Sequence, residues 1–329
     1  VNIPYGSMAS AISPEPDDRQ SLSTFRSMGG LLAGMIIMVL VPLVVYKTLE
    51  NGTVVMDGGK FTMLAGVFSV LAVGAYLLCY ALTTERVVPQ VDKKTFENNS
   101  VGRMLRNAVT NRSLLSIIAA SIVMLLSQLT MQAMAGYVYP NYYGSATAQS
   151  ASTGAMGIGM IIAAAIAKPI ARKFGKAELS IGSNLFAGIM GIVSFIIRPQ
   201  SVWVFVAMQF LCWFGLGVFT MISWALITDV IDDAELKNGI REDGSVYALY
   251  SFARKIGQAL SAGLSGFLLS AIGYTAETAN LPKVKEGIFN ISTLIPSLGF
   301  ILLALILWFW YPLHKKTVDE NVRKLKEMR

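Results

Sequence analysis

Apolar segments long enough to cross a lipid bilayer recur along almost the whole chain. A membrane-spanning helix needs about 20 mostly apolar residues in succession. This length predicts spans over residues 24–46, 61–82, 113–138, 148–170, 177–197, 201–228, 244–272 and 288–312. A shorter stretch at 1–12 has the pattern of the end of a further helix. The pattern predicts an all-α, polytopic membrane protein of about eight complete transmembrane helices plus a partial one.

The composition agrees with a membrane protein. Apolar residues make up 54% of the 329 residues and charged residues only 14%, whereas soluble domains average about 25% charged residues. The formal net charge of +7 would suit nucleic acid, but the basic side chains gather in the loops and at the C-terminus. That distribution indicates which loops lie on the cytoplasmic side of the membrane. We therefore expect membrane lipid as a partner, no nucleic acid, and no obligate protein partner.

The sequence holds no constellation typical of catalysis. Cys79 and Cys212 both fall inside apolar runs, and the only histidine, His314, follows the last predicted span. No Cys or His pair has metal-ligand spacing, and no G-x-x-x-x-G-K-[ST] phosphate loop is present. We expect neither an enzyme nor a metal site.

The basic loops predict the orientation of the helices. Six basic residues lie in the long loop at 83–112, and others follow the spans that end near residues 170, 228 and 312. The alternate loops hold only Lys47, Lys60, Arg198, Lys283 and Lys285. Loops rich in Lys and Arg stay on the cytoplasmic side. The 83–112 loop and the C-terminus are therefore expected inside.

Three stretches carry a resemblance to a known family. They read NIPYGSMASAISPEPDDRQSLSTFR, KPIARKFGKA and ALITDVIDDAELKNGIREDGSVYALYSFARKIGQAL. They resemble the glycoside–pentoside–hexuronide:cation symporters, a branch of the major facilitator superfamily that includes melibiose and glucuronide carriers. The resemblance implies secondary active symport of a sugar, glycoside or hexuronide with Na⁺ or H⁺, without another cofactor, in the cytoplasmic (inner) membrane of a bacterium. A transporter-derived sugar sensor and a membrane-embedded enzyme are the alternatives.

The long loop divides the chain in a way that fits this family, whose members are two six-helix halves joined by a cytoplasmic loop. We expect the end of an N-terminal half at 1–82, a central loop at 83–112, a C-terminal half at 113–313 and a cytoplasmic tail at 314–329. The chain opens VNIPYGSMAS, without a starting Met. We expect an N-terminally truncated carrier that lacks most of the family's cation site and does not transport alone.

Adjacent cations in the segment at 244–272 are the first candidates for substrate binding. A charge inside hydrocarbon costs about 2.5–3.5 kcal/mol on insertion scales, so such cations are used or paired. Lys255 matches the lysine of the family's eleventh helix and is our first choice. Arg254, about 100° away on the helix, could instead bind a hexuronate carboxylate through its planar fork. Tyr250 and Ser251 precede them at helical spacing.

Further candidates come from other segments. The resemblance places Arg26 near the sugar; the alternative is a cation that reaches the membrane surface. It also places Asn2 where melibiose-type carriers have an acidic sugar-binding residue, with Tyr5 on the same short helix. Gln128 and Gln132 lie one turn apart, and their amides suit either sugar hydroxyls or contacts between helices.

Asp229, Asp232 and Asp233 end a long apolar segment at the expected cytoplasmic side. Asp229 lies deepest and is our candidate for a gate, in which it would pair with a basic residue of another helix. We expect Asp232 and Asp233 to be hydrated.

Overall fold

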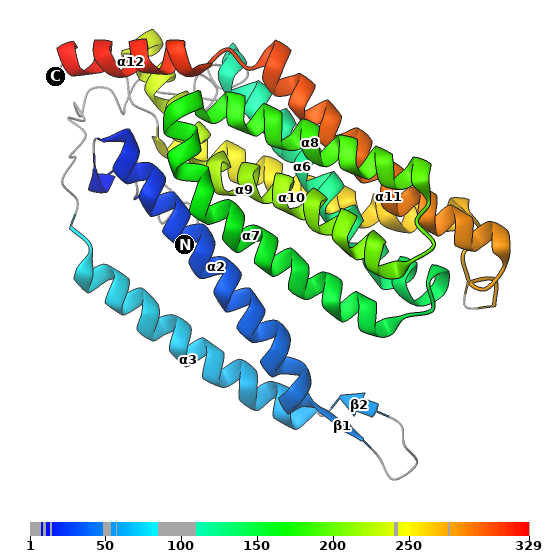
Figure 1. Ribbon diagram of the computed structural model, residues 1–329. Helices are drawn as coiled ribbons and strands as arrows, with labels where there is room; N and C mark the ends of the chain where they lie inside the picture. Colours follow the sequence, from blue (N-terminus) through cyan, green and yellow to red (C-terminus); the bar gives the residue numbers. More distant parts are fainter. Residues whose placement is uncertain are drawn as a thin grey trace.

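The computed structural model of the chain is a bundle of long helices (Figure 1). It describes residues 8, 11–13, 15–48, 54–56, 58–84, 110–239, 243–275 and 277–328. Two candidate residues, Asn2 and Tyr5, lie outside the described residues, as do most of the predicted partial helix and residues 85–109 of the predicted central loop.

Each of the eight predicted spans falls on one long helix, which confirms the all-α fold. The elements are α2 (Pro16–Val45), the strands β1 (Tyr46–Thr48) and β2 (Val54–Met56), α3 (Gly58–Leu82), α6 (Arg112–Tyr137) with the π-helical turn η1 (Val138–Tyr142), α7 (Ala146–Phe174), α8 (Lys176–Ile197), α9 (Val202–Asn238), α10 (Asp243–Ala271), α11 (Pro282–Leu305) with the π-helical turn η2 (Ile306–Trp310), and α12 (Lys315–Met328). The two strands pair antiparallel as a short hairpin between α2 and α3.

Six stretches of the described chain have both the length and the apolarity of a membrane span: 58–82, 112–142, 147–174, 176–197, 202–237 and 282–310. Helices α2 and α10 are not among these stretches; α10 packs its inner face against α6 and exposes Phe252 and Phe267 on its outer side. The prediction ended one span at residue 228, whereas α9 runs on to Asn238 and is 37 residues long in all. At about 1.5 Å per residue it is longer than the hydrocarbon core is thick, so α9 carries its acidic end beyond the apolar layer.

Local sequence signals explain where several helices begin and end. The side chain of Asn111 accepts hydrogen bonds from the backbone N–H groups of Ser113 and Leu114, which caps the start of α6. Ser145 caps α7 in the same way. Gly239 ends α9 with a φ of 70°, a left-handed conformation that glycine adopts without steric cost.

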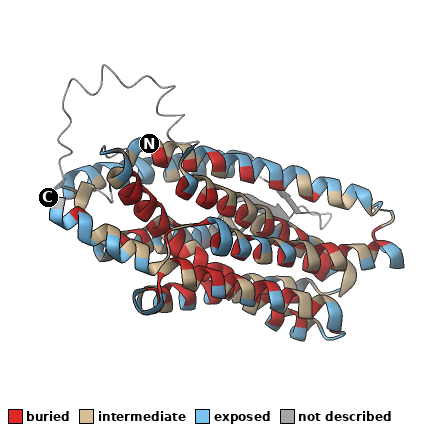
Figure 2. Ribbon diagram, turned by 90° about the horizontal axis from the view of Figure 1, so that it is seen from above, coloured by how far each residue is buried: buried red, intermediate tan, exposed pale blue. Residues whose placement is uncertain are grey.

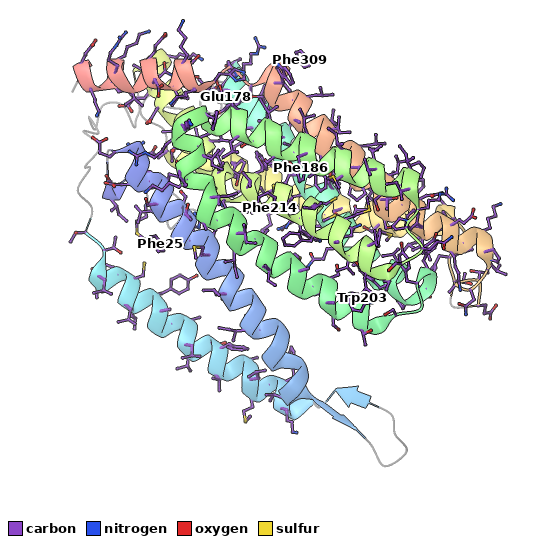
Figure 3. The ribbon with its side chains drawn as sticks, in the orientation of Figure 1. Phe25, Glu178, Phe186, Trp203, Phe214 and Phe309 are labelled. Atoms are coloured by element: carbon purple, nitrogen blue, oxygen red, sulfur yellow. The ribbon has the colours of Figure 1, made fainter. Side chains whose placement is uncertain are left out.

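Helices α6–α11 form one closely packed body, and α2 packs against it through α9 and α7. Helix α3 lies beside α2 at the edge (Figure 1), and the structure buries no residue of α3. The buried residues gather on the inner faces of the bundle (Figure 2). Helix α12 crosses one end, where Glu178 also lies, while Trp203 lies at the opposite end (Figure 3). We call these the α12 end and the opposite end.

Small residues set the spacing between several helices. A Cβ atom on Gly188 of α8 would lie 2.6 Å from Cγ1 of Ile301 and 3.0 Å from the carbonyl oxygen of Ser297, both on α11. A Cβ atom on Gly215 of α9 would lie 2.5 Å from the carbonyl oxygen of Ser183. Close backbone approach of this kind is how helices associate in lipid, where there is little hydrophobic drive between them.

This packing predicts the effect of one added side chain. Gly188→Val should force α8 and α11 apart and cost about 1–3 kcal/mol, as overpacking usually does. The measurement is the thermal unfolding midpoint of the purified protein in detergent. Gly182→Val on the same helix is the matched control, because a Cβ atom there meets nothing within 4 Å. Equal midpoints for the two variants would contradict the packing described here.

Candidate functional site

Two arginines from different helices meet on one tryptophan ring. The guanidinium carbon of Arg26 on α2 lies 4.2 Å from the ring centroid of Trp224 on α9, and that of Arg254 on α10 lies 5.7 Å from it. The Trp224 ring stacks on Tyr247 at 6.1 Å and meets Tyr250 edge-on at 5.4 Å. We call these five residues the Trp224 cluster.

The position of Tyr250 follows from how α10 packs on α6. Its hydroxyl accepts a hydrogen bond of 2.9 Å from the hydroxyl of Ser121 on α6. One face of α10 can approach α6 closely because Gly257 has no side chain: a Cβ atom there would lie 3.2 Å from Leu125. With Tyr250 fixed in the interior, Arg254 lies one turn further along α10, and its guanidinium is 5.7 Å from the Tyr250 ring.

The cluster lies within the apolar part of the bundle. Trp224 falls inside the candidate span at 202–237, where a charged group is costly unless it finds a partner. Aromatic faces attract cations by about 0.5–2 kcal/mol, more when water is excluded. The Trp224 cluster therefore holds two cations in place, and the guanidinium of Arg254 still offers hydrogen-bond donors. Such donors can bind oxygen atoms of a ligand.

The structure brings together Arg26, Arg254 and Tyr250 of the predicted substrate-binding residues. Lys255, the first choice from sequence, is exposed and donates a 3.2 Å hydrogen bond to the side-chain oxygen of Gln258. Its role stays a prediction. The other predicted residues are spread along α10 and α6: Ser251 and Gln128 are half-buried, and Gln132 is exposed.

Trp224 was not predicted from the sequence. It was read as one more apolar residue of a span, since nothing in the spacing of α9 singles it out. The sequence did contain one indication of its importance: Trp224 lies five residues before Asp229 on the same helix. The contact with Arg26, about 200 residues away in sequence, is visible only in the folded chain.

A second set of charges lies at the α12 end, between α2 and α9. The Arg19 guanidinium lies 3.2 Å from both carboxylate oxygens of Asp232, and its Nε donates a 2.8 Å bond to the carbonyl of Ser13. Only 1% of Arg19 and 6% of Asp232 are exposed. The expectation that Asp232 is hydrated was wrong, because α2 covers it and supplies the counter-charge.

The neighbouring aspartates of α9 are also buried and paired. Asp229 accepts a 2.6 Å bond from the ammonium of Lys176 at the start of α8. Asp233, also expected to be hydrated, is 5% exposed; it accepts bonds from Ser113 of α6 at 2.9 Å, Lys237 at 2.7 Å and Asn321 of α12 at 3.4 Å. We call Asp229, Asp232 and Asp233 with these partners the aspartate network. Its geometry is that of a charge lock, and the gating role of Asp229 stays a prediction.

Two nearby groups complete this end of the bundle. The Lys168 ammonium on α7 donates a hydrogen bond to the Ser21 hydroxyl on α2, a second polar link between α2 and the main body. Tyr311, just beyond the last span, donates a 3.4 Å bond to the carbonyl of Leu226. Burial, and next the charge of Asp229, raise the pKa of Tyr311 well above its usual value, so its phenol stays a neutral donor.

Comparison with known proteins defines the class. Residues 1–315 match the family described as MFS/sugar transport protein. The chain therefore belongs to this family, which confirms the resemblance seen in the sequence. It is a multi-pass membrane transporter of the sugar-transport type and not an enzyme.

Individual relatives agree with this family assignment. The chain is 29% identical over 331 residues to the uncharacterized symporter YjmB of Bacillus subtilis, covering 99% of this chain and 69% of that protein. It is 28% identical to the putative sulfoquinovose importer of Escherichia coli, covering 100% and 69%, and 26% identical to the glucuronide carrier protein homolog of Escherichia coli, covering 98% and 68%.

Among solved structures, the Escherichia coli fucose:proton symporter FucP aligns with a TM-score of 0.65 at 14% identity, covering 94% of this chain and 72% of that chain. At this low identity the likeness supports the fold alone. The fold it supports is that of the major facilitator superfamily.

Removal of one partner tests the aspartate network. Arg19→Met should leave the Asp232 carboxylate buried without its arginine and lower stability by about 3–5 kcal/mol. Thermal unfolding in detergent measures the loss. The double variant Arg19→Met, Asp232→Leu should recover most of it.

The matched control for this prediction is Arg323→Met on α12. Arg323 and Glu327 are both 71% exposed at the side chain and 3.9 Å apart, and exposed pairs contribute about 1 kcal/mol or less. A midpoint for Arg19→Met no lower than that of Arg323→Met would show that the Arg19–Asp232 pair does not hold α2 to α9.

Proposed function

We propose that the protein is part of a secondary active transporter that moves a sugar, glycoside or hexuronide across the cytoplasmic membrane by symport with Na⁺ or H⁺. The observation that carries this proposal is the Trp224 cluster, where Arg26 and Arg254 lie on one aromatic platform within the apolar part of the bundle. Aromatic faces stack against sugar rings, and guanidinium groups bind sugar oxygens and carboxylates.

The pair of guanidinium groups favours a hexuronide over a neutral glycoside. Arginine offers a rigid, planar set of donors that matches a carboxylate with two parallel hydrogen bonds. Among the described residues, the contacts of Arg254 are with the rings of Trp224 and Tyr250, so its donors remain available to a ligand anion. One relative is named a glucuronide carrier protein homolog, and a glucuronide carries such a carboxylate.

The aspartate network supports an alternating-access cycle. Major facilitator carriers work by rocking two halves around a central site. We assign α2 and α3 to one half and α6–α11 to the other, joined at the α12 end by Arg19–Asp232. Opening that end breaks the ion pair and exposes both charges to water. The ion pair that crosses this gate is Arg19–Asp232; Asp229, which we also assign to the gate, is paired with Lys176 of its own half.

Binding of two sugars to the purified chain in lipid nanodiscs tests the substrate class. Methyl β-D-glucuronide should bind at least tenfold more tightly than methyl β-D-glucoside. Arg254→Ala should lower glucuronide affinity about 10–100-fold, the range expected for loss of charge-assisted hydrogen bonds.

Lys255→Ala is the comparison variant, since Lys255 is adjacent in sequence but exposed. If Lys255→Ala loses binding and Arg254→Ala does not, the sugar lies along the exposed face of α10 and the Trp224 cluster is not the site.

The proposed orientation places the α12 end in the cytoplasm. Single-cysteine variants Glu320→Cys on α12 and Lys283→Cys at the opposite end report on it, in a background where Cys79 and Cys212 are replaced by serine. Both positions are exposed. In intact cells, a membrane-impermeant maleimide should label Lys283→Cys and leave Glu320→Cys unmodified. The reverse pattern would refute the orientation.

A further inference from the structure

The outer side of α11 carries an exposed apolar stripe. Leu298, Leu302, Leu305 and Phe309 follow one another at intervals of three or four residues, so they lie along one side of the helix. Each of them is at least 40% exposed, whereas the inner sides of α11 pack against α8 and α6. Phe309, the last residue of the stripe, lies at the α12 end (Figure 3). We call these four residues the α11 stripe.

The length of the α11 stripe matches one leaflet of a bilayer. Phe309 is 11 residues beyond Leu298, which corresponds to about 16 Å at roughly 1.5 Å per residue. The hydrocarbon core of a bilayer is about 30 Å thick, so each leaflet supplies about 15 Å. The stripe ends where the candidate span 282–310 ends. An acyl chain of one lipid can therefore lie along its whole length.

Aromatic side chains mark the headgroup level at the α12 end of the stripe. Trp308 and Trp310, on either side of Phe309, are 55% and 40% exposed. The rings of Trp308 and Phe309 stack with their centroids 5.9 Å apart. Tryptophan is enriched at the boundary between the hydrocarbon core and the polar headgroups. This end of α11 and η2 is therefore expected beside lipid headgroups.

Arg112 lies at the same level, on the neighbouring helix. It is the first residue of the candidate span 112–142, and Trp310 is the last residue of the span 282–310. Its Nε donates a 3.1 Å hydrogen bond to the carbonyl of Trp310, and its Nη2 donates one of 3.1 Å to the carbonyl of Phe309. The last carbonyls of a helix have no partner within the helix. Arg112 supplies one here, and its guanidinium is thereby fixed at the end of the α11 stripe.

The charge of Arg112 has no counter-charge in the part of the chain that the structure describes. A guanidinium group has five N–H donors, and the two carbonyls use two of them without carrying a net charge. The side chain is exposed and forms no ion pair with a described acidic residue. The remaining donors and the positive charge are therefore available to an anion at the headgroup level.

The combination of the stripe and the arginine selects the kind of ligand. A lipid phosphate accepts charge-assisted hydrogen bonds from a guanidinium group, and its acyl chain covers the exposed leucines. A zwitterionic headgroup would bring a second cation next to Arg112. A free phosphate ion would leave the leucines without a contact. An anionic phospholipid matches both the charge and the apolar surface.

We propose that the α11 stripe and Arg112 form a binding site for one anionic phospholipid. Its phosphate lies on the Arg112 guanidinium, and one acyl chain runs along Leu305, Leu302 and Leu298 towards the middle of the membrane. The site rests on the membrane-spanning fold and is independent of the sugar and of the Trp224 cluster.

Native mass spectrometry of the detergent-purified chain tests the site. The chain is titrated with phosphatidylglycerol or with phosphatidylcholine of the same acyl chains, and the affinity for the first bound lipid is measured. Arg112→Gln should lower the affinity for phosphatidylglycerol about fivefold, the size expected for one basic residue at an anionic membrane surface. It should leave the affinity for phosphatidylcholine unchanged. Arg112→Lys should keep most of the phosphatidylglycerol affinity, because the ammonium retains the charge.

Arg198→Gln is the matched control. Arg198 is an exposed arginine at the far end of α8, and its Nη2 donates a 3.3 Å bond to the side-chain oxygen of Asn290. Its replacement should leave the affinity for both lipids unchanged. The comparison of the Gln and Lys variants separates lipid binding from a purely structural role, because both variants remove the planar fork from the two carbonyls and only one removes the charge.

Three results would overturn the proposal. The first is equal phosphatidylglycerol affinity in the parent and Arg112→Gln. The second is an equal loss in Arg112→Gln and Arg112→Lys, which would show that Arg112 acts only as a helix cap. The third is displacement of the lipid by inorganic phosphate or by glycerophosphoglycerol, the headgroup without acyl chains, which would show that the site binds a free anion. None of these results bears on sugar binding.

Discussion

The burial of three aspartates at one end of α9 is the constraint on which the arrangement of this end depends. Carboxylates removed from water cost several kcal/mol each unless charges and hydrogen bonds compensate them. Here the compensation comes from four other helices: Arg19 on α2, Ser113 on α6, Lys176 on α8 and Asn321 on α12. These polar contacts add to the apolar packing between the helices at this end. Because each contact is an ion pair or a hydrogen bond, water can replace it, which a purely apolar core would not allow.

The same helix carries the Trp224 cluster, and this links the two sites mechanically. Trp224 and Asp229 are five residues apart, so they lie about 7.5 Å apart along the axis of α9. Trp224 meets Arg26, and Asp232 meets Arg19, seven residues earlier on α2. Seven residues are close to two helical turns, so both arginines lie on the same face of α2. One helix pair therefore presents an aromatic platform at one level and an ion pair at the next.

The sequence predicted the helices well and the site in part, for different physical reasons. The eight long helices were predictable because crossing a bilayer requires about 20 apolar residues in succession. Such a run can be recognised directly in the sequence. Arg254 was found because a cation inside an apolar run is conspicuous, and Arg26 because the family resemblance places an arginine near the sugar. Trp224 was not, since an aromatic residue in a span looks like any other apolar residue. Asp232 and Asp233 were expected in water because their partners, Arg19 and Ser113, are more than 100 residues away.

The shared helix pair suggests how substrate and gate influence each other. A ligand shifts a conformational equilibrium only if it binds the two states with different affinity. A substrate that contacts Arg26 on α2 and Trp224 on α9 depends on the relative position of those two helices, and so does the Arg19–Asp232 ion pair. Any movement that separates the helices changes both sets of contacts together. Binding at the Trp224 cluster and opening at the α12 end are therefore thermodynamically coupled, and by reciprocity the state of the ion pair sets the affinity for substrate. The coupling needs no chain of intermediate residues, because one interface contains both sites.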